Sequence, residues 1–213
     1  MRPHAALVLC LALFVLTARA HAAGATYRFD PVHSQITFFV DHDGYSDASG
    51  RLHIARGWFR FDPDDWSTAK VVADIDLGGV DMGDRDWNRV VAGDDFLDAK
   101  AHPYAHFVSG EVEKTGAETG ILFGRLTLRG HTVGIAFPFR FNRRAFTIYG
   151  LHTVAGFTGL ATLERKDFGM DAFAGVIGPQ VKVLLEIEGI EDSGAEHTYA
   201  DQVARETTHA DQK

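Results

Sequence analysis

Apolar residues recur at every second position through most of this chain, between Tyr27 and Glu188. Ile36, Phe38 and Val40 share one face in this pattern, and similar runs follow along the sequence. A period of two is typical of a strand that buries one face. About eight such runs are joined by short turns, with no helix alternating between them. The pattern predicts an all-β fold, a closed antiparallel barrel of about eight strands, because closure removes exposed strand edges.

One segment, residues 85–109, departs from this period at its start. Asp84 can cap a helix, and Trp87, Val90 and Val91 follow at helical spacing and form one apolar stripe. We therefore expect one short amphipathic helix that closes an end of the barrel or packs along its wall.

The first residues resemble an export signal. Arg2 is followed by an apolar run from Ala5 to Thr17, and a small-x-small site ends at Ala20. This predicts a signal peptide over residues 1–20, with cleavage possible up to residue 23, and a retained anchor as the alternative. Cys10, the only cysteine, lies inside this leader, so the exported domain must be held together by its core.

The other end of the chain is polar. Residues 191–213 carry six acids against two bases and lack apolar periodicity, so we expect an acidic disordered tail. A helix near Tyr199–Glu206 that docks on a partner is the alternative. Residues 26–190 remain as the single folded domain. The formal net charge of −8 argues against partners such as nucleic acid and anionic membranes.

Candidate catalytic and metal sites fail on spacing. His102 and His106 are four residues apart, but on a strand this spacing separates them by about 13 Å, too far to share an ion. The aspartates of residues 81–98 lack the spacing of a calcium loop. No nucleophile elbow, phosphate loop or dinucleotide fingerprint occurs. We expect no catalytic residue, no metal and no cofactor.

Several motifs, in order, resemble the YceI-like family. The match covers residues 27–190. Each motif is modest by itself, but together they are specific because they come in order at suitable spacing. The motifs are Asp30-Pro31-Val32-His33-Ser34, Phe38-x-Val40-x-His42-x-Gly44, Gly57-x-Phe59-x-Phe61-Asp62, Val80-Asp81, Arg85-Asp86, Asp95-Phe96-Leu97-Asp98, Pro103, Phe107, Ser109, Gly124-x-Leu126-Thr127-Leu128-x-Gly130 and Arg165-x-Asp167-Phe168-Gly169.

This resemblance implies a lipocalin-like barrel in the bacterial periplasm that binds a long apolar ligand, without catalytic activity. The ligand in that family is typically a polyisoprenoid, either an isoprenoid quinone or a prenyl diphosphate. One departure stands out: after Arg85-Asp86 the family commonly continues with an acidic residue and then His-Leu, whereas this chain has Trp87-Asn88-Arg89-Val90. We expect Trp87 to reshape the helix side of the cavity.

The hypothesis is therefore a periplasmic carrier or storage protein for an isoprenoid lipid. The residues expected to line the cavity are Phe38, Val40, Phe59, Phe61, Val71, Trp87, Phe96, Phe107, Phe123, Phe137, Phe139 and Phe157. The residues expected at a polar mouth, where a diphosphate or quinone head needs donors, are His42, Arg51, Arg85 and Arg165. Structural salt bridges are the alternative role for these arginines.

Other functions stay open at this point. The barrel could hold a different amphiphile, such as a fatty acid or fatty amide. It could be an acid–base hydrolase that uses His33 or His42, or a packed protein-interaction module. Transient contact with a membrane or a membrane cytochrome is a further expectation, and the oligomeric state is open, a homodimer included.

Overall fold

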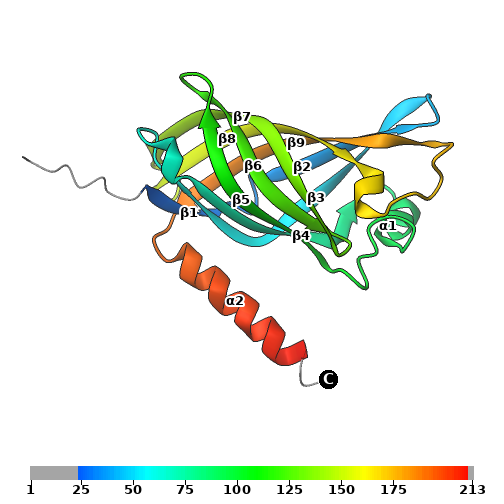
Figure 1. Cartoon of the computed structure of the whole chain (residues 1–213). Coiled ribbons are helices and arrows are strands. Elements are labelled where there is room, and N and C mark those ends of the chain that lie inside the picture. The colour runs from blue at the N-terminus through cyan, green and yellow to red at the C-terminus, as the bar shows by residue number, and fades with distance from the viewer. Residues whose placement is uncertain (1–23, 211–213) are drawn as a thin grey trace, which may run out of the picture.

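The computed structural model describes residues 24–210. Nine strands form one antiparallel sheet, and this sheet closes into a barrel, as the sequence predicts (Figure 1). The leader expected over residues 1–20 lies outside the described residues. The strands are β1 (Ala25–Phe29), β2 (Gln35–His42), β3 (Ser46–Phe61), β4 (Lys70–Asp81), β5 (Tyr104–Lys114), β6 (Thr119–Leu128), β7 (His131–Thr147), β8 (His152–Glu164) and β9 (Ile177–Glu191). The helices are α1 (Arg85–Ala92) and α2 (Ala195–Ala210), with short 3-10 turns η1 (Trp66–Thr68) and η2 (Arg165–Phe168).

The ring has eight positions, because β1 and β2 share one of them. Around the barrel the order is β3, β2, β9, β8, β7, β6, β5 and β4, and pairing of β3 with β4 closes it. β1 pairs with β3 and β9, the same neighbours as β2, and runs in the same direction. β1 and β2 are thus one strand interrupted by the turn at residues 30–34.

The two-residue period sets which side chains face inward. On β6, Leu122, Leu126 and Leu128 are buried, whereas Phe123 and Arg125 between them are exposed. The buried residues of neighbouring strands meet in one core inside the barrel. Because side chains alternate across a strand, one buried position fixes the face of every other residue on it.

Helix α1 forms where the sequence predicts it. The Asp84 carboxylate accepts hydrogen bonds from the backbone N–H groups of Asp86 and Trp87, which satisfies the first turn. The helix contacts β4 and lies at one end of the barrel (Figure 1). No helix among residues 24–210 combines the length and apolar character that a membrane span requires.

The prediction of a disordered tail over residues 191–213 is wrong for most of that segment, because β9 continues to Glu191 and helix α2 follows it. α2 packs against the outer wall of the barrel, mainly on β3. Ala195 is buried in an outside cluster with Trp58 and Val72, and Tyr199 packs against this cluster. The spacing of Ala195 and Tyr199, four residues, is the sequence signal for this face. Contact with the wall adds stability to a helix of 16 residues, a length that is marginal for an isolated helix in water.

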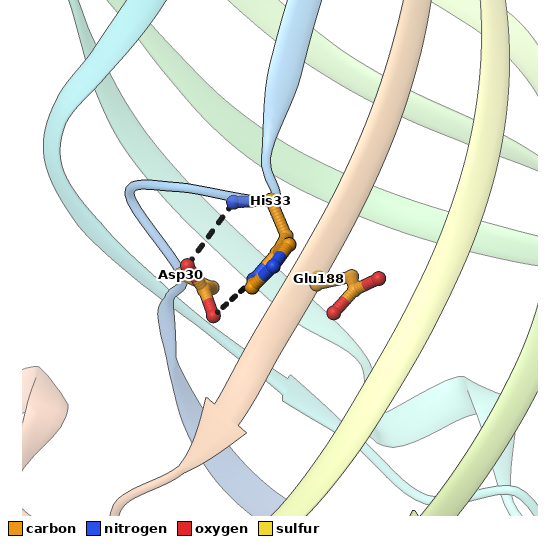
Figure 2. Close-up of side chains that lie close together, drawn as sticks. All are labelled: Asp30, His33 and Glu188. Carbon is orange, nitrogen blue, oxygen red and sulfur yellow. Dashed lines mark hydrogen bonds and ion pairs between the residues drawn. The ribbon is translucent and has the colours of Figure 1, made fainter. Parts of the chain in front are cut away.

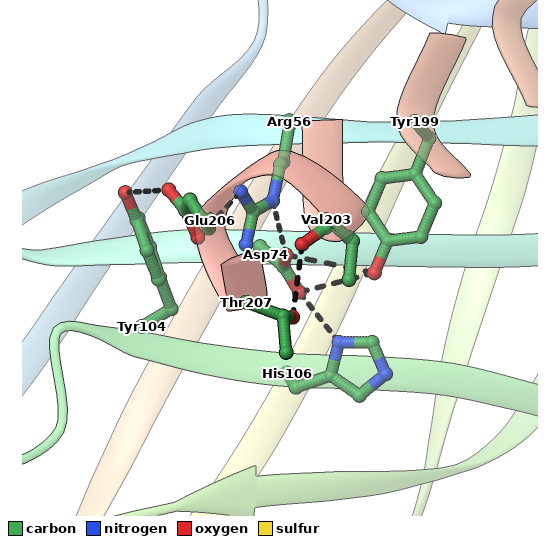
Figure 3. Close-up of polar contacts among 8 residues, drawn as sticks. All are labelled: Arg56, Asp74, Tyr104, His106, Tyr199, Val203, Glu206 and Thr207. Atoms are coloured by element: carbon green, nitrogen blue, oxygen red, sulfur yellow. Dashed lines mark hydrogen bonds and ion pairs between the residues drawn. The ribbon is translucent and has the colours of Figure 1, made fainter. Parts of the chain in front are cut away.

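A buried carboxylate anchors α2 to the wall (Figure 3). Asp74 points outward from β4 and is 4% exposed. It accepts hydrogen bonds from Arg56 Nε at 2.6 Å and from the Tyr199 hydroxyl at 3.4 Å, and it also pairs with His106. Arg56 continues the network to Glu206 on α2 at 2.7 Å. Burial, followed by the charge of Asp74, raises the pKa of Tyr199 to about 12, so this hydroxyl remains a hydrogen-bond donor well into the alkaline range.

Candidate functional site

The barrel encloses an apolar cavity of about 540 Å³. Its walls come from positions on strands β1 to β9, completed by α1 and the loop before β9. Of the lining residues, only His42, Arg60 and Arg165 carry ionisable side chains. Arg60 belongs to the outside, because its guanidinium pairs with Glu196 of α2 at 2.9 Å. The volume lies within the range of about 300–1,000 Å³ typical of small-molecule sites.

Aromatic rings close the cavity at the end far from α1. The Trp66 ring stacks on Phe139 with 5.4 Å between centroids, and Phe61 meets Trp66 edge-on at 5.3 Å. Phe157 contacts Phe61 edge-on at 5.0 Å. The Trp66 indole N–H donates to the Pro63 carbonyl at 3.0 Å, so its polar group is satisfied. Phe61, Phe139 and Phe157 of this cluster line the cavity, so its floor is made of apolar rings.

The mouth lies at the α1 end. Four of the lining residues are exposed, and all four belong to α1 or to the loop between η2 and β9. These are Trp87, Val90, Phe173 and Val176. Phe173 stacks on Phe96 with 5.9 Å between ring centroids, and so joins the loop to the segment after α1. The opening is thus rimmed by apolar side chains.

Most of the residues predicted to line a cavity lie along it. They are Phe38, Val40, Phe59, Phe61, Val71, Trp87, Phe96, Phe107, Phe137, Phe139 and Phe157. Phe123 does not: it is 36% exposed and faces outward, which corrects the expectation. Its neighbour Leu122 takes the inward position instead. On β6 the even-numbered residues face inward, so the alternation along the strand places Phe123 outside despite its aromatic side chain.

The polar mouth is smaller than expected. His42 and Arg165 line the cavity, but Arg51 and Arg85 do not, and both are exposed. Arg51 alternates with inward residues on β3 and so points outward. Arg85 lies two residues before Trp87, about 200° away around a helix, and so faces away from the cavity. His42 packs its ring near Trp87, with 6.1 Å between centroids.

Arg165 is committed to the protein backbone. Its side chain donates to the carbonyl oxygens of Ile177 at 3.1 Å, Gly178 at 3.2 Å and Ala172 at 2.8 Å. The guanidinium also lies over the Phe96 ring, 5.7 Å from the centroid. Burial lowers the pKa of Arg165, although a nearby aspartate opposes this effect. The residue therefore holds the mouth loop in place, and most of its donors are occupied.

The Asp30 turn brings together metal-ligand types at one place (Figure 2). Asp30, His33 and Glu188 each offer a donor atom, and these atoms lie within 4.8 Å of one another. However, Asp30 already accepts bonds from the N–H groups of Val32 and His33, and from His33 Nδ1 at 2.9 Å. Ser34 Oγ donates to the Glu188 carbonyl at 2.8 Å. These bonds fasten the interruption between β1 and β2 to β9.

The pKa values of this turn follow from the same contacts. Burial acts to raise the pKa of Asp30, but bonds from His33 and the two backbone N–H groups outweigh it and leave the pKa lowered. The hydrogen bond to Asp30 and its charge raise the pKa of His33.

His33 and His42 do not share a site, because His42 lies nine residues further along, about 30 Å along an extended strand.

The apolar mouth loop was missed from sequence. Phe173 and Val176 lie among small residues in the loop before β9, without a strand or helix period that would indicate burial. The available signal was composition alone: apolar residues in a turn region that otherwise has no reason to carry them.

The YceI-like domain model matches residues 27–189. A UPF0312 protein of Pseudomonas aeruginosa (strain LESB58) is 35% identical over 188 residues, which is 87% of this chain and 96% of that protein. A UPF0312 protein of Pectobacterium carotovorum is 30% identical over 181 residues, covering 84% and 93%.

Two solved structures share the fold. BcnA of Burkholderia cenocepacia has a TM-score of 0.67 at 22% identity, covering 75% of this chain and 98% of its own. A polyisoprenoid binding domain from Saccharophagus degradans has a TM-score of 0.61 at 15% identity, covering 79% and 99%. With the sequence matches, the closed barrel and its motifs, these findings establish that the chain belongs to the YceI-like family.

Proposed function

We propose that this protein binds a long-chain isoprenoid lipid with an uncharged head group inside the barrel. One observation carries the proposal: a cavity closed by aromatic rings at one end, open at the other, and lined almost entirely by apolar side chains. The similarity in fold to a domain described as polyisoprenoid binding supports the same class of ligand.

The apolar contact is large enough to bind a lipid tail without charge. Each buried CH₂ contributes about 0.8 kcal/mol, so ten of them supply about 8 kcal/mol. Ordering the tail and losing its free motion offset several kcal/mol of this gain. For a long tail the gain from apolar contact therefore exceeds the cost of ordering it by a wide margin, whereas for a short fatty chain the excess is small.

The charges at the mouth favour a neutral head group. The segment 81–98 at this end carries six aspartates against two arginines. Arg165, the buried cation of the lining, already donates to three carbonyl groups. A diphosphate or carboxylate head would thus meet acidic side chains and few free donors. An isoprenoid quinone needs only weak donors, and so fits better than a prenyl diphosphate.

We also propose that the protein acts in the periplasm, as a carrier or store of this lipid. The signal peptide expected over residues 1–20 supports this placement. Cell fractionation with an antibody against the chain tests it: the protein should appear in the osmotic-shock fluid. Recovery in the cytoplasmic fraction would contradict the location while leaving ligand binding untouched.

A matched pair of variants tests the binding site. Ala161 lines the cavity on β8, and its neighbour Thr162 faces outward. Ala161→Phe should fill the cavity, whereas Thr162→Phe adds the same ring outside. We expect native mass spectrometry of protein from its own host to show a bound lipid for the parent and Thr162→Phe, and little for Ala161→Phe.

Titration of delipidated protein then separates head groups. An isoprenoid quinone should quench the fluorescence of Trp87 at the mouth, with Trp87→Phe as the control. A prenyl diphosphate of equal length should bind at least tenfold more weakly. Equal or tighter binding of the diphosphate would refute the head-group argument, and no binding of any lipid would refute the proposed function.

A further inference from the structure

The hairpin between β7 and β8 projects beyond the barrel. β6 begins at Thr119, which pairs with Arg140, so later residues of β7 have no partner in β6. β9 pairs with β8 only from Val154 onward. Residues 146–153 therefore form a two-stranded projection, in which β7 and β8 pair only with each other, up to Thr147 and His152.

Apolar side chains cover the tip of this projection. Phe146, Ile148, Tyr149 and Leu151 are 62%, 74%, 85% and 75% exposed. An isolated exposed apolar residue needs no explanation, but a cluster of large ones marks an interaction surface. We call these four residues the hairpin tip.

The hairpin tip has a defined shape. The Tyr149 N–H donates to Thr147 Oγ1 at 3.2 Å, and the His152 ring bonds with the Gly150 carbonyl at 3.1 Å. Leu151 has a φ of 55°, in the left-handed region that a branched side chain seldom adopts. Neither backbone preference nor burial explains a leucine here, so its exposed side chain requires another reason.

The charge along the hairpin's own sequence differs from that of the chain as a whole. No acidic residue occurs between Thr132 and Leu163, although the chain carries 29 acids against 21 bases. Arg140, Arg143 and Arg144 lie in this stretch. Arg144 is held by the Tyr27 hydroxyl and by Glu191, while Arg143 is exposed.

We propose that the hairpin tip docks on a lipid bilayer that contains anionic phospholipid. Aromatic and aliphatic side chains at a tip insert into the interface, and nearby arginines attract the anionic head groups. A second copy of the chain fits less well, because a symmetric pairing of two tips would bring the Arg143 side chains together. This proposal does not depend on which ligand the cavity holds.

Docking through the hairpin fixes the orientation of the barrel. β7 begins at His131, beside the Arg129 side chain that donates to the Phe96 carbonyl at the mouth, so its far end lies opposite the mouth. The mouth would then face away from the bilayer. The mouth rim is also apolar, but its six aspartates over residues 81–98 would repel an anionic surface. The two apolar regions thus make opposite predictions for anionic vesicles.

Vesicle flotation tests the proposal with protein purified as its native cell processes it. Vesicles contain phosphatidylcholine alone or phosphatidylcholine mixed with phosphatidylglycerol. The hairpin variant is Ile148→Ser with Leu151→Ser, and the matched mouth variant is Val90→Ser with Val176→Ser. All four positions are exposed, so both variants should fold, which circular dichroism checks.

We expect binding to the mixed vesicles, weakened by added salt. The hairpin variant should lower the partition coefficient by roughly tenfold or more, and the mouth variant should leave it unchanged. Arg143→Glu should also lower it. Loss of binding in the mouth variant alone, equal binding to phosphatidylcholine, or no binding would overturn the proposal. So would a dimer in light scattering that only the hairpin variant dissociates, since the tip would then serve a second copy.

Discussion

Replacing Arg165 with Met tests whether this buried cation is a scaffold for the mouth. The substitution keeps the apolar stem but removes three hydrogen bonds to the carbonyl groups of residues 172, 177 and 178. Each hydrogen bond from a charged donor contributes about 1.5–3 kcal/mol. The cost of burying the guanidinium offsets part of this gain, so the free energy of unfolding should fall by about 3–4 kcal/mol.

The assay is equilibrium unfolding in urea, followed by circular dichroism. With a slope of roughly 2 kcal/mol per molar, the midpoint should fall by about 1.5–2 M. Arg165→Lys keeps the charge but not the planar fork, and should fall between the parent and Arg165→Met. Arg51→Met, at an exposed position on β3, is the control and should leave the midpoint nearly unchanged.

Hydrogen exchange localises the effect. In Arg165→Met, the backbone amides of residues 171–178 should exchange faster than those of β5 and β6, because the loop loses its anchor. The reasoning is refuted if Arg165→Met unfolds at the same urea concentration as Arg51→Met. Unchanged stability with weaker ligand binding would instead assign Arg165 to recognition of the head group.

Three further predictions concern the wall, the turn and the register. Asp74→Asn removes the buried carboxylate from Arg56, which keeps only the more exposed Glu206 as its partner, and should lower the free energy of unfolding by about 1.5–3 kcal/mol in urea unfolding. The raised pKa of His33 stabilises the fold at pH values below the ordinary histidine pKa of 6.5, and this stabilisation is lost as the pH rises through the raised pKa. The lowered pKa of Asp30 stabilises the fold at pH values above the ordinary pKa of 3.8, and this stabilisation is lost only as the pH falls below it. The difference in melting temperature between the parent and His33→Asn should therefore be largest between about pH 4.5 and 6, and a difference that grows above pH 7 would contradict this sign. Phe107→Ala should destabilise by about 3–5 kcal/mol, and Phe123→Ser by under 1, so equal losses would show that the register assigned to β6 is wrong.

Local pattern was enough to predict the class of fold and one helix. Alternation along the strands indicates a half-buried sheet, and closure follows because an open sheet of this size would expose its edges. Asp84 and the stripe begun by Trp87 located α1 because capping and helical spacing act over a single turn. The same alternation also placed most lining residues, with Phe123 as the exception.

The tertiary structure decided everything that depends on distant partners. α2 is a helix because Trp58 and Val72 offer it an apolar wall and Asp74 offers a buried acceptor, and its own polar sequence does not contain that information. The sequence suggested that Arg165 could donate to a ligand, but in the fold its guanidinium donates to carbonyl groups of the loop that follows it. Sequence determines which face of a strand is apolar, because side chains alternate locally. Only folding determines which polar groups are already satisfied, because their partners come from far along the chain.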